Sequence, residues 1–267
     1  MRNATLSAMA ERFSHRTREP CRERKSSWLV PLLIACSIAF PVPRTDAQLR
    51  STPQANSPEE FDAYLVVLSK KTPAEIISAG NNFARAWPHS ELLAEVYQLE
   101  MDAYRSLNDP TNSIQAGQKA LEIAPDNVTV IANLAYILAD GTSDRQHLDL
   151  AQQYARKALM ILKSFHVPKR ISPEQWNVIQ HRVESEVHAA LGLVAYKNDD
   201  SALAIREFET SISLAPTPSP MQYYRLGLLY EATGKKARAI DMFEQAAHLN
   251  DATIQRLAEK HLEALQH

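Results

Sequence analysis

Apolar side chains in residues 223–247 recur every three or four positions, which is the spacing of one face of an α-helix. The pattern breaks once, at Gly234, where glycine allows the chain to turn. It therefore predicts two antiparallel helices joined by a short turn. Small residues at Gly227 and Ala239 would let the two helices approach closely, and the ring of Phe243 would fill the space beside them. We expect Gly227 to face Ala239 with no room between them.

A second copy of this hairpin lies upstream at a constant spacing of 35 residues. The matched pairs are Leu191 and Leu226, Gly192 and Gly227, Ala204 and Ala239, Phe208 and Phe243, and Ser211 and Ala246. The two copies resemble the tetratricopeptide repeat, a helical hairpin of about 34 residues. A single hairpin of this kind cannot bury its own apolar face, so it has to stack on copies of itself.

Three more divergent copies keep the same phase towards the N-terminus. The resemblance implies an all-α fold: a right-handed α-solenoid of about five helical hairpins, closed by a C-terminal capping helix. One solenoid domain is expected over residues 57–267. Its hairpins are expected at 57–90, 94–127, 128–165, 173–218 and 220–250, and the capping helix at 252–265.

Four helix starts support this organisation independently. Each places Ser or Thr before a proline and Glu or Gln three residues after the hydroxyl: 57–60, 72–75, 172–175 and 219–222. In a capping box the hydroxyl accepts a hydrogen bond from an orphan backbone amide, and the Glu or Gln side chain reaches back. Proline suits the first helical position because it lacks the donor that would go unpaired there. We predict a capping box at each start.

Residues 173–197 contain no breaker, so they are predicted to form one helix about 37 Å long. Its first half extends beyond what the repeat needs and carries an apolar stripe: Trp176, Ile179 and Val183. We expect the preceding helix, with the 165–171 loop folded over it, to cover this stripe. The alternative is an exposed Trp176 that marks a partner or self-association surface.

The first 47 residues are typical of a secretory signal peptide. Basic residues at 22, 24 and 25 precede an apolar run at 28–40, and small residues follow at 45–47. The apolar run is shorter than the roughly 20 residues that a spanning helix needs. We expect cleavage after Ala47, a flexible tether over 48–56, and a periplasmic or secreted protein. An uncleaved leader that anchors the protein in the membrane is the alternative.

A second alternative concerns the segment Leu33-Ile34-Ala35-Cys36, which resembles a bacterial lipobox. In such a segment the cysteine is lipidated and becomes the new N-terminus, which anchors the protein at a membrane. The apolar run continues past Cys36, where lipoproteins usually turn polar. Lipid anchoring at Cys36 therefore stays open.

The positions of the cysteines and the net charge argue against several classes of function. Cys21 and Cys36 both lie in the leader, so cleavage would leave no cysteine for disulfides, zinc–thiolate sites or nucleophilic catalysis. Residues 48–267 carry 21 basic and 27 acidic residues. This balance argues against nucleic acid as a partner, because its binding rests on basic surface.

One weak pattern of possible metal ligands lies in the expected long helix. His181, Glu184 and His188 lie on one helical face and could hold an ion. No HExxH motif, glycine-rich phosphate loop or Gly-x-Ser-x-Gly motif accompanies them. A packed or solvent-edge face is the favoured interpretation, so we expect no catalytic residue, no metal and no cofactor. A metal-dependent enzyme that uses these three residues is the least favoured alternative.

The family resemblance implies a concave groove lined by the first helices of successive hairpins, in which a peptide or partner protein lies. Polar side chains occupy the matching positions, and their groups can pair with a peptide backbone or carboxylate. They are Gln98, Asp102, Arg105, Asn133, Tyr136, Tyr196, Tyr224, Arg225 and Glu231. The apolar residues on the same face are Ala189, Leu193 and Leu228.

The sequence thus predicts a non-enzymatic protein–protein interaction scaffold of the bacterial cell envelope, with a protein or peptide partner. The alternative is a lipid-anchored component, attached at Cys36, of an envelope or outer-membrane assembly machine. Contact with the membrane is expected only if the leader is retained or Cys36 is lipidated. Self-association into a homo-oligomer is compatible with either function.

Overall fold

The computed structural model describes residues 53–141, 144–164 and 172–266. The chain separates into two units, Met1–Leu49 and Arg50–His267, and the described residues all belong to the second. The expected signal peptide, the cysteine at 36 and the first residues of the expected tether lie outside the described residues.

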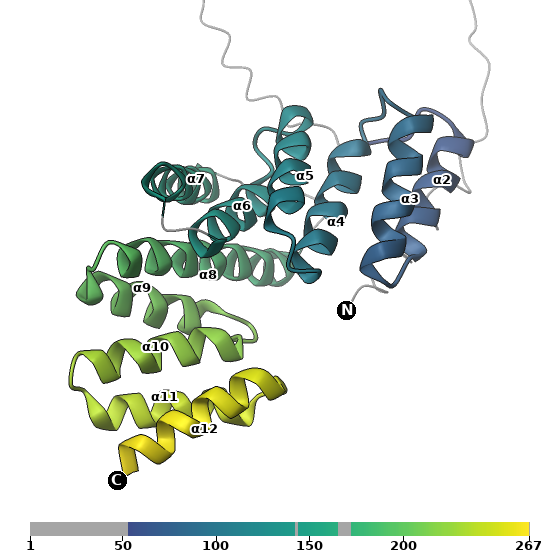
Figure 1. Ribbon diagram of the computed structural model, residues 1–267. Coiled ribbons are helices and arrows are strands. Elements are labelled where there is room, and N and C mark those ends of the chain that lie inside the picture. The colour runs from purple at the N-terminus through teal and green to yellow at the C-terminus, as the bar shows by residue number, and fades with distance from the viewer. Residues whose placement is uncertain (1–52, 142–143, 165–171, 267) are drawn as a thin grey trace, which may run out of the picture. The chain divides into compact units, whose positions relative to one another are not determined.

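The described part of the chain is built from helices and contains no strand. Pairs of antiparallel helices follow one another along the chain, and a single helix ends it (Figure 1). The predicted all-α solenoid of about five hairpins with a terminal helix is confirmed. The helices are α2 (Pro58–Ser69), α3 (Pro73–Ala86), α4 (Leu93–Ser106), α5 (Pro110–Ile123), α6 (Val128–Gly141), α7 (Arg145–Ser164), α8 (Pro173–Lys197), α9 (Ser201–Leu214), α10 (Pro220–Ala232), α11 (Lys236–His248) and α12 (Ala252–Gln266).

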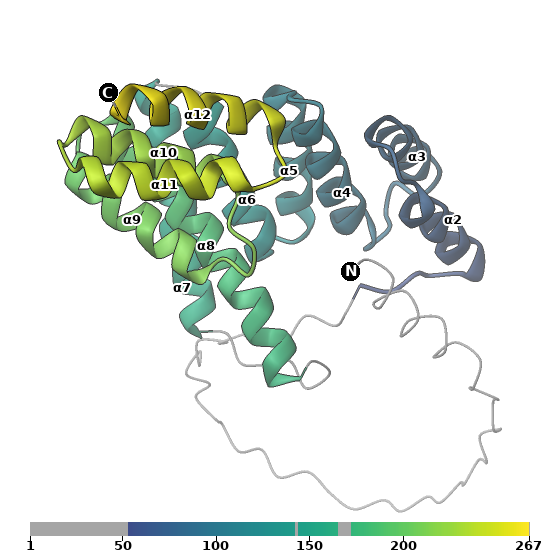
Figure 2. The same ribbon diagram turned by 90° about the horizontal axis from the view of Figure 1, so that it is seen from below.

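Each hairpin packs on the next through neighbouring helices. Helix α3 contacts α4, α5 contacts α6, and α9 contacts α10, while α8 packs on both α6 and α7. The terminal helix α12 lies against α11 and α10 (Figure 2). Side-chain contacts link the first helices of successive hairpins: α4 contacts α6 and α8, and α6 contacts α10. None of the helices that the structure describes is both long and apolar enough to cross a bilayer.

Three of the four predicted capping boxes are complete, at Thr72, Ser172 and Ser219. The fourth, at Ser57, is wrong in one half. The Ser57 hydroxyl accepts from the Glu60 amide at 3.2 Å, but the Glu60 carboxylate accepts from the Asn56 amide at 2.6 Å instead of reaching back to Ser57. Glu60 is almost fully buried, so its side chain turns inward and binds the amide one residue earlier.

In the last two hairpins a phenylalanine ring packs directly on a glycine of the facing helix, which lets the two helices lie close together. A Cβ atom at Gly227 would lie 2.7 Å from Cε1 of Phe243, and one at Gly192 would lie 3.1 Å from the ring of Phe208. The expectation that Gly227 faces Ala239 is therefore wrong, because Phe243 supplies the nearest atoms. Gly117 has the same role with aliphatic partners: its Cβ would meet Leu134 at 2.7 Å.

A buried hydroxyl pair joins α8 to α9. The Ser185 hydroxyl donates to the Ser211 carbonyl at 2.8 Å, and the Ser211 hydroxyl donates to the Ser185 carbonyl at 2.7 Å. The Gln222 amide of α10 donates to the Ser211 hydroxyl at 2.9 Å, which brings a third helix into the network. Ser211 stands where the next copy has Ala246, so a polar side chain is accommodated in the core because its partners are buried with it.

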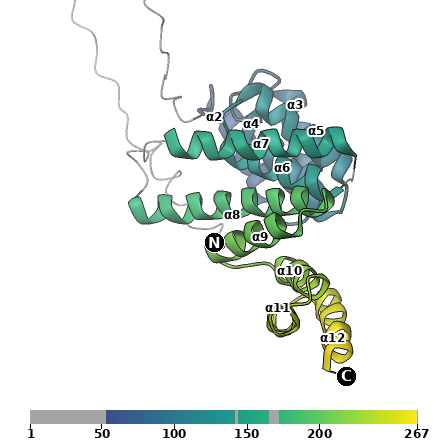
Figure 3. The same cartoon turned by 90° about the vertical axis from the view of Figure 1, so that its left-hand side faces the viewer.

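Helix α8 is continuous over 25 residues and runs alongside α7 (Figure 3). Trp176 is 8% exposed and lies in one core cluster with Leu162 of α7 and with Val183. The prediction of a long helix covered by its predecessor is confirmed, and the alternative of an exposed Trp176 surface is wrong. The 165–171 loop, expected to fold over the stripe, lies outside the described residues.

Replacing Gly227 with alanine would drive a Cβ into the buried ring of Phe243. Because overpacking forces the ring or the backbone to shift, we expect the free energy of unfolding to fall by about 1–3 kcal/mol. For a domain of this size the melting temperature would fall by about 2–12 °C. Gly141→Ala is the matched control, since its Cβ would meet only Pro110, at 3.8 Å. Thermal unfolding followed by circular dichroism measures both variants, and equal melting temperatures would contradict this packing.

Candidate functional site

Two polar contacts tie the first helices of the second and third hairpins together. Asn133 of α6 donates from its amide to the Asp102 carboxylate of α4 at 3.2 Å. Asn127, just before α6, donates to the Gln98 side chain of α4 at 3.0 Å. Residues three and four apart on a helix share a face, so Gln98, Asp102 and Arg105 form one row along α4. The structure therefore brings these predicted groove residues together.

Arg105, the last residue of this row on α4, contacts both α6 and α8. The Arg105 guanidinium lies over the Tyr136 ring, 4.7 Å from its centroid, and 2.8 Å from the Glu186 carboxylate of α8. That carboxylate oxygen is buried and has no well-aligned hydrogen bond among the described residues, so the contact is an ion pair without hydrogen-bond geometry. One side chain of α4 thus touches both α6 and α8.

Arg225 of α10 closes the cluster from the other side. Its guanidinium donates to the Tyr136 hydroxyl at 2.9 Å and pairs with the Asp140 carboxylate. The Lys197 ammonium of α8 donates to the Asp140 carbonyl at 2.8 Å. We call Arg105, Tyr136, Asp140, Glu186, Lys197 and Arg225 the central cluster. Its members come from four successive hairpins, and Tyr136 and Arg225 stand 89 positions apart.

The central cluster holds three cations and two carboxylates around a phenol. Burial raises the pKa of the Tyr136 hydroxyl, against the opposing effect of Arg225, so the phenol stays protonated. Because this oxygen accepts from Arg225, its own O–H can donate to a ligand. Burial lowers the pKa of the Lys197 ammonium, and the attraction of Asp140 opposes that shift. The arrangement can present hydrogen-bond donors to a carboxylate or a peptide carbonyl.

Two predicted groove residues face the chain's own last helix. The Tyr224 hydroxyl lies 3.3 Å from Nε2 of His261, and the Glu231 carboxylate lies 2.8 Å from Nδ1 of the same ring. His261 also stacks on Phe243, with the ring centroids 4.9 Å apart. Helix α12 therefore covers the first helix of the last hairpin at these two positions, which the sequence pattern did not reveal.

The remaining predicted groove residues separate by burial. Tyr196 is 51% exposed on α8, so it offers surface area to a partner. Ala189 and Leu193 of the same helix are at most 3% exposed, so the expectation that they line a surface is wrong. Leu228 of α10 is partly buried against the main core. The accessible polar row thus runs from α4 through α6 to Arg225.

The proposed metal pattern does not form a site. Among the described residues, no three His, Cys, Asp or Glu side chains gather closely enough to hold an ion. His188 is engaged elsewhere, with Nδ1 2.6 Å from the Glu207 carboxylate of α9, and Glu184 accepts from Gln180 at 2.8 Å. The described residues therefore do not support the alternative of a metal-dependent enzyme that uses His181, Glu184 and His188.

Sequence reasoning missed one unusual group, Glu100 of α4. It is only 4% exposed, and its Oε1 has no hydrogen-bond partner among the described residues. This oxygen packs directly against Gly80 of α3, where a Cβ would collide with it. Burial raises the pKa of the Glu100 carboxyl to about 7, although Lys119 opposes the shift. A carboxylate inside the apolar stripe between Tyr97 and Tyr104 was the available signal.

Comparison with known families finds two repeats in the chain. Residues 94–127 and 223–253 match the model of the tetratricopeptide repeat. No curated protein matches the chain. The two matched segments are the second hairpin and the last one, so the predicted resemblance is confirmed at the level of the repeat.

Solved structures share the fold. A thermophilic tetratricopeptide-repeat protein of Thermus thermophilus aligns with a TM-score of 0.51 and 13% identity, covering 76% of this chain and 94% of that chain. PilW, described as a widely conserved type IV pilus biogenesis factor, aligns with a TM-score of 0.53 and 15% identity, covering 74% of this chain and 82% of its own. At these identities the likeness concerns the fold alone. The fold is typical of non-enzymatic scaffolds that bind proteins or peptides.

The raised pKa of the Glu100 carboxyl predicts that the free energy of unfolding falls as the pH rises from about 5 to 8. The pKa of this carboxyl is about 7 in the folded chain, against a reference value of 4.5. Below pH 4.5 the carboxyl is protonated in both the folded and the unfolded chain, so its burial as an ion costs no stability. Above about pH 7 the folded chain has to bury the ionised carboxylate, and the full loss of unfolding free energy is reached. We expect the wild-type protein to lose about 1–3 kcal/mol of unfolding free energy over this range.

Urea unfolding of Glu100→Gln at pH 5 and pH 8 provides the measurement. This variant should lose much less stability between the two pH values than the wild-type protein does. Glu122→Gln, which changes an exposed carboxylate of α5, is the matched control. If Glu100→Gln keeps the whole pH dependence, the buried carboxyl is not its cause.

Proposed function

We propose that the protein is a non-enzymatic scaffold of the bacterial cell envelope that holds an extended peptide or a partner protein along its first helices. The observation that carries this proposal is the central cluster, in which donors from α4, α6, α8 and α10 converge on one surface. Guanidinium, phenol and amide groups that meet in a row suit a ligand with repeated carbonyls and an occasional carboxylate.

The contacts within the cluster indicate how a ligand would be received. Arg225 and Arg105 are each paired with a carboxylate, so their positive charges are balanced before a partner arrives. Each guanidinium has five N–H donors, which leaves donors for a ligand oxygen beside the existing pair. A preorganised side chain of this kind loses little conformational freedom on binding, which favours affinity.

The centre of the binding surface lies between α4 and α10 rather than at the C-terminal end. Tyr224 and Glu231 are engaged by His261 of α12, so they are not expected to contact a partner. The residues that we propose for partner binding are Gln98, Asp102, Arg105, Asn133, Tyr136, Tyr196 and Arg225.

The leader supports a place outside the cytoplasm. A basic segment, a short apolar run and small residues at 45–47 favour export, cleavage after Ala47 and a periplasmic or secreted protein. The alternative is lipidation at Cys36, which would make the chain an anchored component of an envelope or outer-membrane assembly machine. The solenoid would then act at the membrane surface without entering the bilayer.

A triple variant tests the binding surface. Replacing Asn133, Tyr136 and Arg225 with alanine should remove partner capture in a crosslinking pull-down from the native envelope, because it deletes the donors that α6 and α10 offer. The matched control replaces Arg206, Lys236 and Glu244, which lie exposed on second helices. Circular dichroism of both variants checks that helicity is kept. Full capture by a folded triple variant would contradict the assignment.

Mass spectrometry of the protein from its native host tests the leader. An N-terminus at Gln48 is expected for the cleaved form, because Ala47 follows the signal-peptide pattern. A lipid-modified Cys36 at the N-terminus would instead support the anchored alternative. An intact leader in the purified envelope would contradict both forms.

A further inference from the structure

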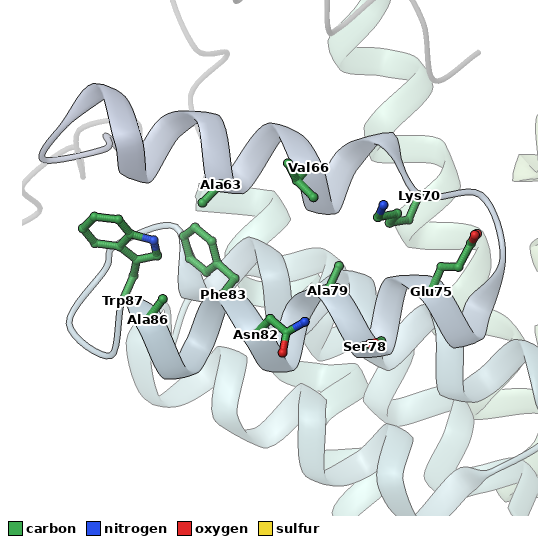
Figure 4. Close-up of a pocket in the computed structure, with 10 residues that line it drawn as sticks. All are labelled: Ala63, Val66, Lys70, Glu75, Ser78, Ala79, Asn82, Phe83, Ala86 and Trp87. Atoms are coloured by element: carbon green, nitrogen blue, oxygen red, sulfur yellow. The ribbon is translucent and has the colours of Figure 1, made fainter.

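The first hairpin carries an open slot between α2 and α3. The slot has a volume of about 510 Å³, and its floor is apolar. Ala63 and Val66 of α2 face Ala79, Phe83 and Ala86 of α3, and the Trp87 ring stands at one end (Figure 4). Val66 is 51% exposed, so apolar surface is left open to solvent within the described part of the chain.

A cationic shelf adjoins this slot. A second cavity of about 540 Å³ shares Ser78 and Asn82 with the slot and extends to Arg85, Tyr97 and Lys119. Among the described residues, the Arg85 guanidinium donates to two neutral groups of α3, which are the Asn81 carbonyl and the Asn82 side chain. The Lys119 ammonium lies over the Tyr97 ring, 5.4 Å from its centroid.

The two cations of the shelf differ from those of the central cluster. Arg105 and Arg225 each pair with a carboxylate, whereas neither Arg85 nor Lys119 forms an ion pair with a described residue. The two cations line one cavity and are both exposed, although Lys119 also attracts the buried Glu100 carboxyl. An anionic group placed on this shelf would be attracted by both cations.

We propose that the slot and the shelf together bind an acidic amphipathic helix of a partner protein. Its apolar side chains enter the slot between Val66 and Phe83, and its carboxylates lie on Arg85 and Lys119. This is the helix-in-groove mode, in which anchors spaced three or four residues apart enter an apolar channel.

The position of the slot explains why a helix is the occupant. A hairpin of a solenoid buries its faces against its neighbours, and a terminal hairpin needs a cap. At the C-terminal end α12 covers α10 and α11. Among the described residues, no helix has the corresponding place beside α2 and α3. A partner helix would cover the apolar floor there as α12 covers the other end.

Two synthetic peptides of about 18 residues, long enough for several turns of helix, test the proposal against the full mature chain. Both carry leucines at helical spacing, and their polar faces bear glutamates in one peptide and lysines in the other. Trp87 reports binding, because it stands at the slot, while Trp176 is buried far along the chain in the main core. The acidic peptide should shield Trp87 from acrylamide quenching and bind at least tenfold more tightly than the basic one.

Two variants separate the charge from the slot. Arg85→Glu with Lys119→Glu should weaken binding of the acidic peptide at least tenfold, and Val66→Glu should abolish it. Arg206→Glu with Lys236→Glu makes the same change in net charge on second helices elsewhere, and binding should stay unchanged. All five side chains are exposed, Val66 by about half, so folding should persist.

Several outcomes would overturn the proposal. Equal binding of the two peptides, no binding at millimolar peptide, or unchanged binding after charge reversal at Arg85 and Lys119 would each do so. A dimer in light scattering that dissociates on Val66→Glu would assign the slot to a second copy of the chain. Loss of peptide binding in the Asn133, Tyr136 and Arg225 triple variant would place the peptide in the central cluster, so this test fails separately from that of the proposed function.

Discussion

The structure depends on side chains packed against residues that have no Cβ. Leu134 on Gly117 brings α5 and α6 of successive hairpins together, while Phe208 on Gly192 and Phe243 on Gly227 each join the two helices of one hairpin. Since interiors are close-packed, a contact of this kind fixes the separation and rotation of two helices at once. The repeated spacing of 35 residues between the last two contacts passes this geometry from hairpin to hairpin. In a solenoid each repeat contacts only its neighbours, so the regular spacing of the helices depends on these local contacts.

This regularity places polar groups that are remote in sequence beside one another. Arg225 of α10 reaches Tyr136 and Asp140 of α6, which lie 89 and 85 positions away along the chain. The central cluster in turn links the first helices by paired charges and hydrogen bonds. This surface couples the hairpins to one another, and in the function that we propose it would also offer donors to a ligand. The slot beside α2 lies outside this cluster and rests on different residues.

Periodicity and caps predicted the helices well because both are local properties of the chain. The start of α8 at Pro173 and its continuity to Lys197 followed from a capping box and the absence of a breaker. The partner of Gly227 did not follow, because a helical pattern gives the face of a residue and not the reach of a ring from the opposite helix. For the same reason the engagement of Tyr224 by His261 could not be foreseen. The burial of Glu100 and the slot at Val66 both depend on how α3 packs against α4 and α2. The sequence of one segment does not determine such packing between helices.

We propose that a partner lies along the first helices of the hairpins. A photoreactive amino acid placed at Tyr196, which is 51% exposed, tests it directly in cells of the native host. The same group at Glu244, exposed on the second helix α11, serves as the comparison. We expect a crosslink to a defined protein from position 196 and none from position 244. A crosslink from position 244 alone would contradict it, because the partner would then lie on the second helices.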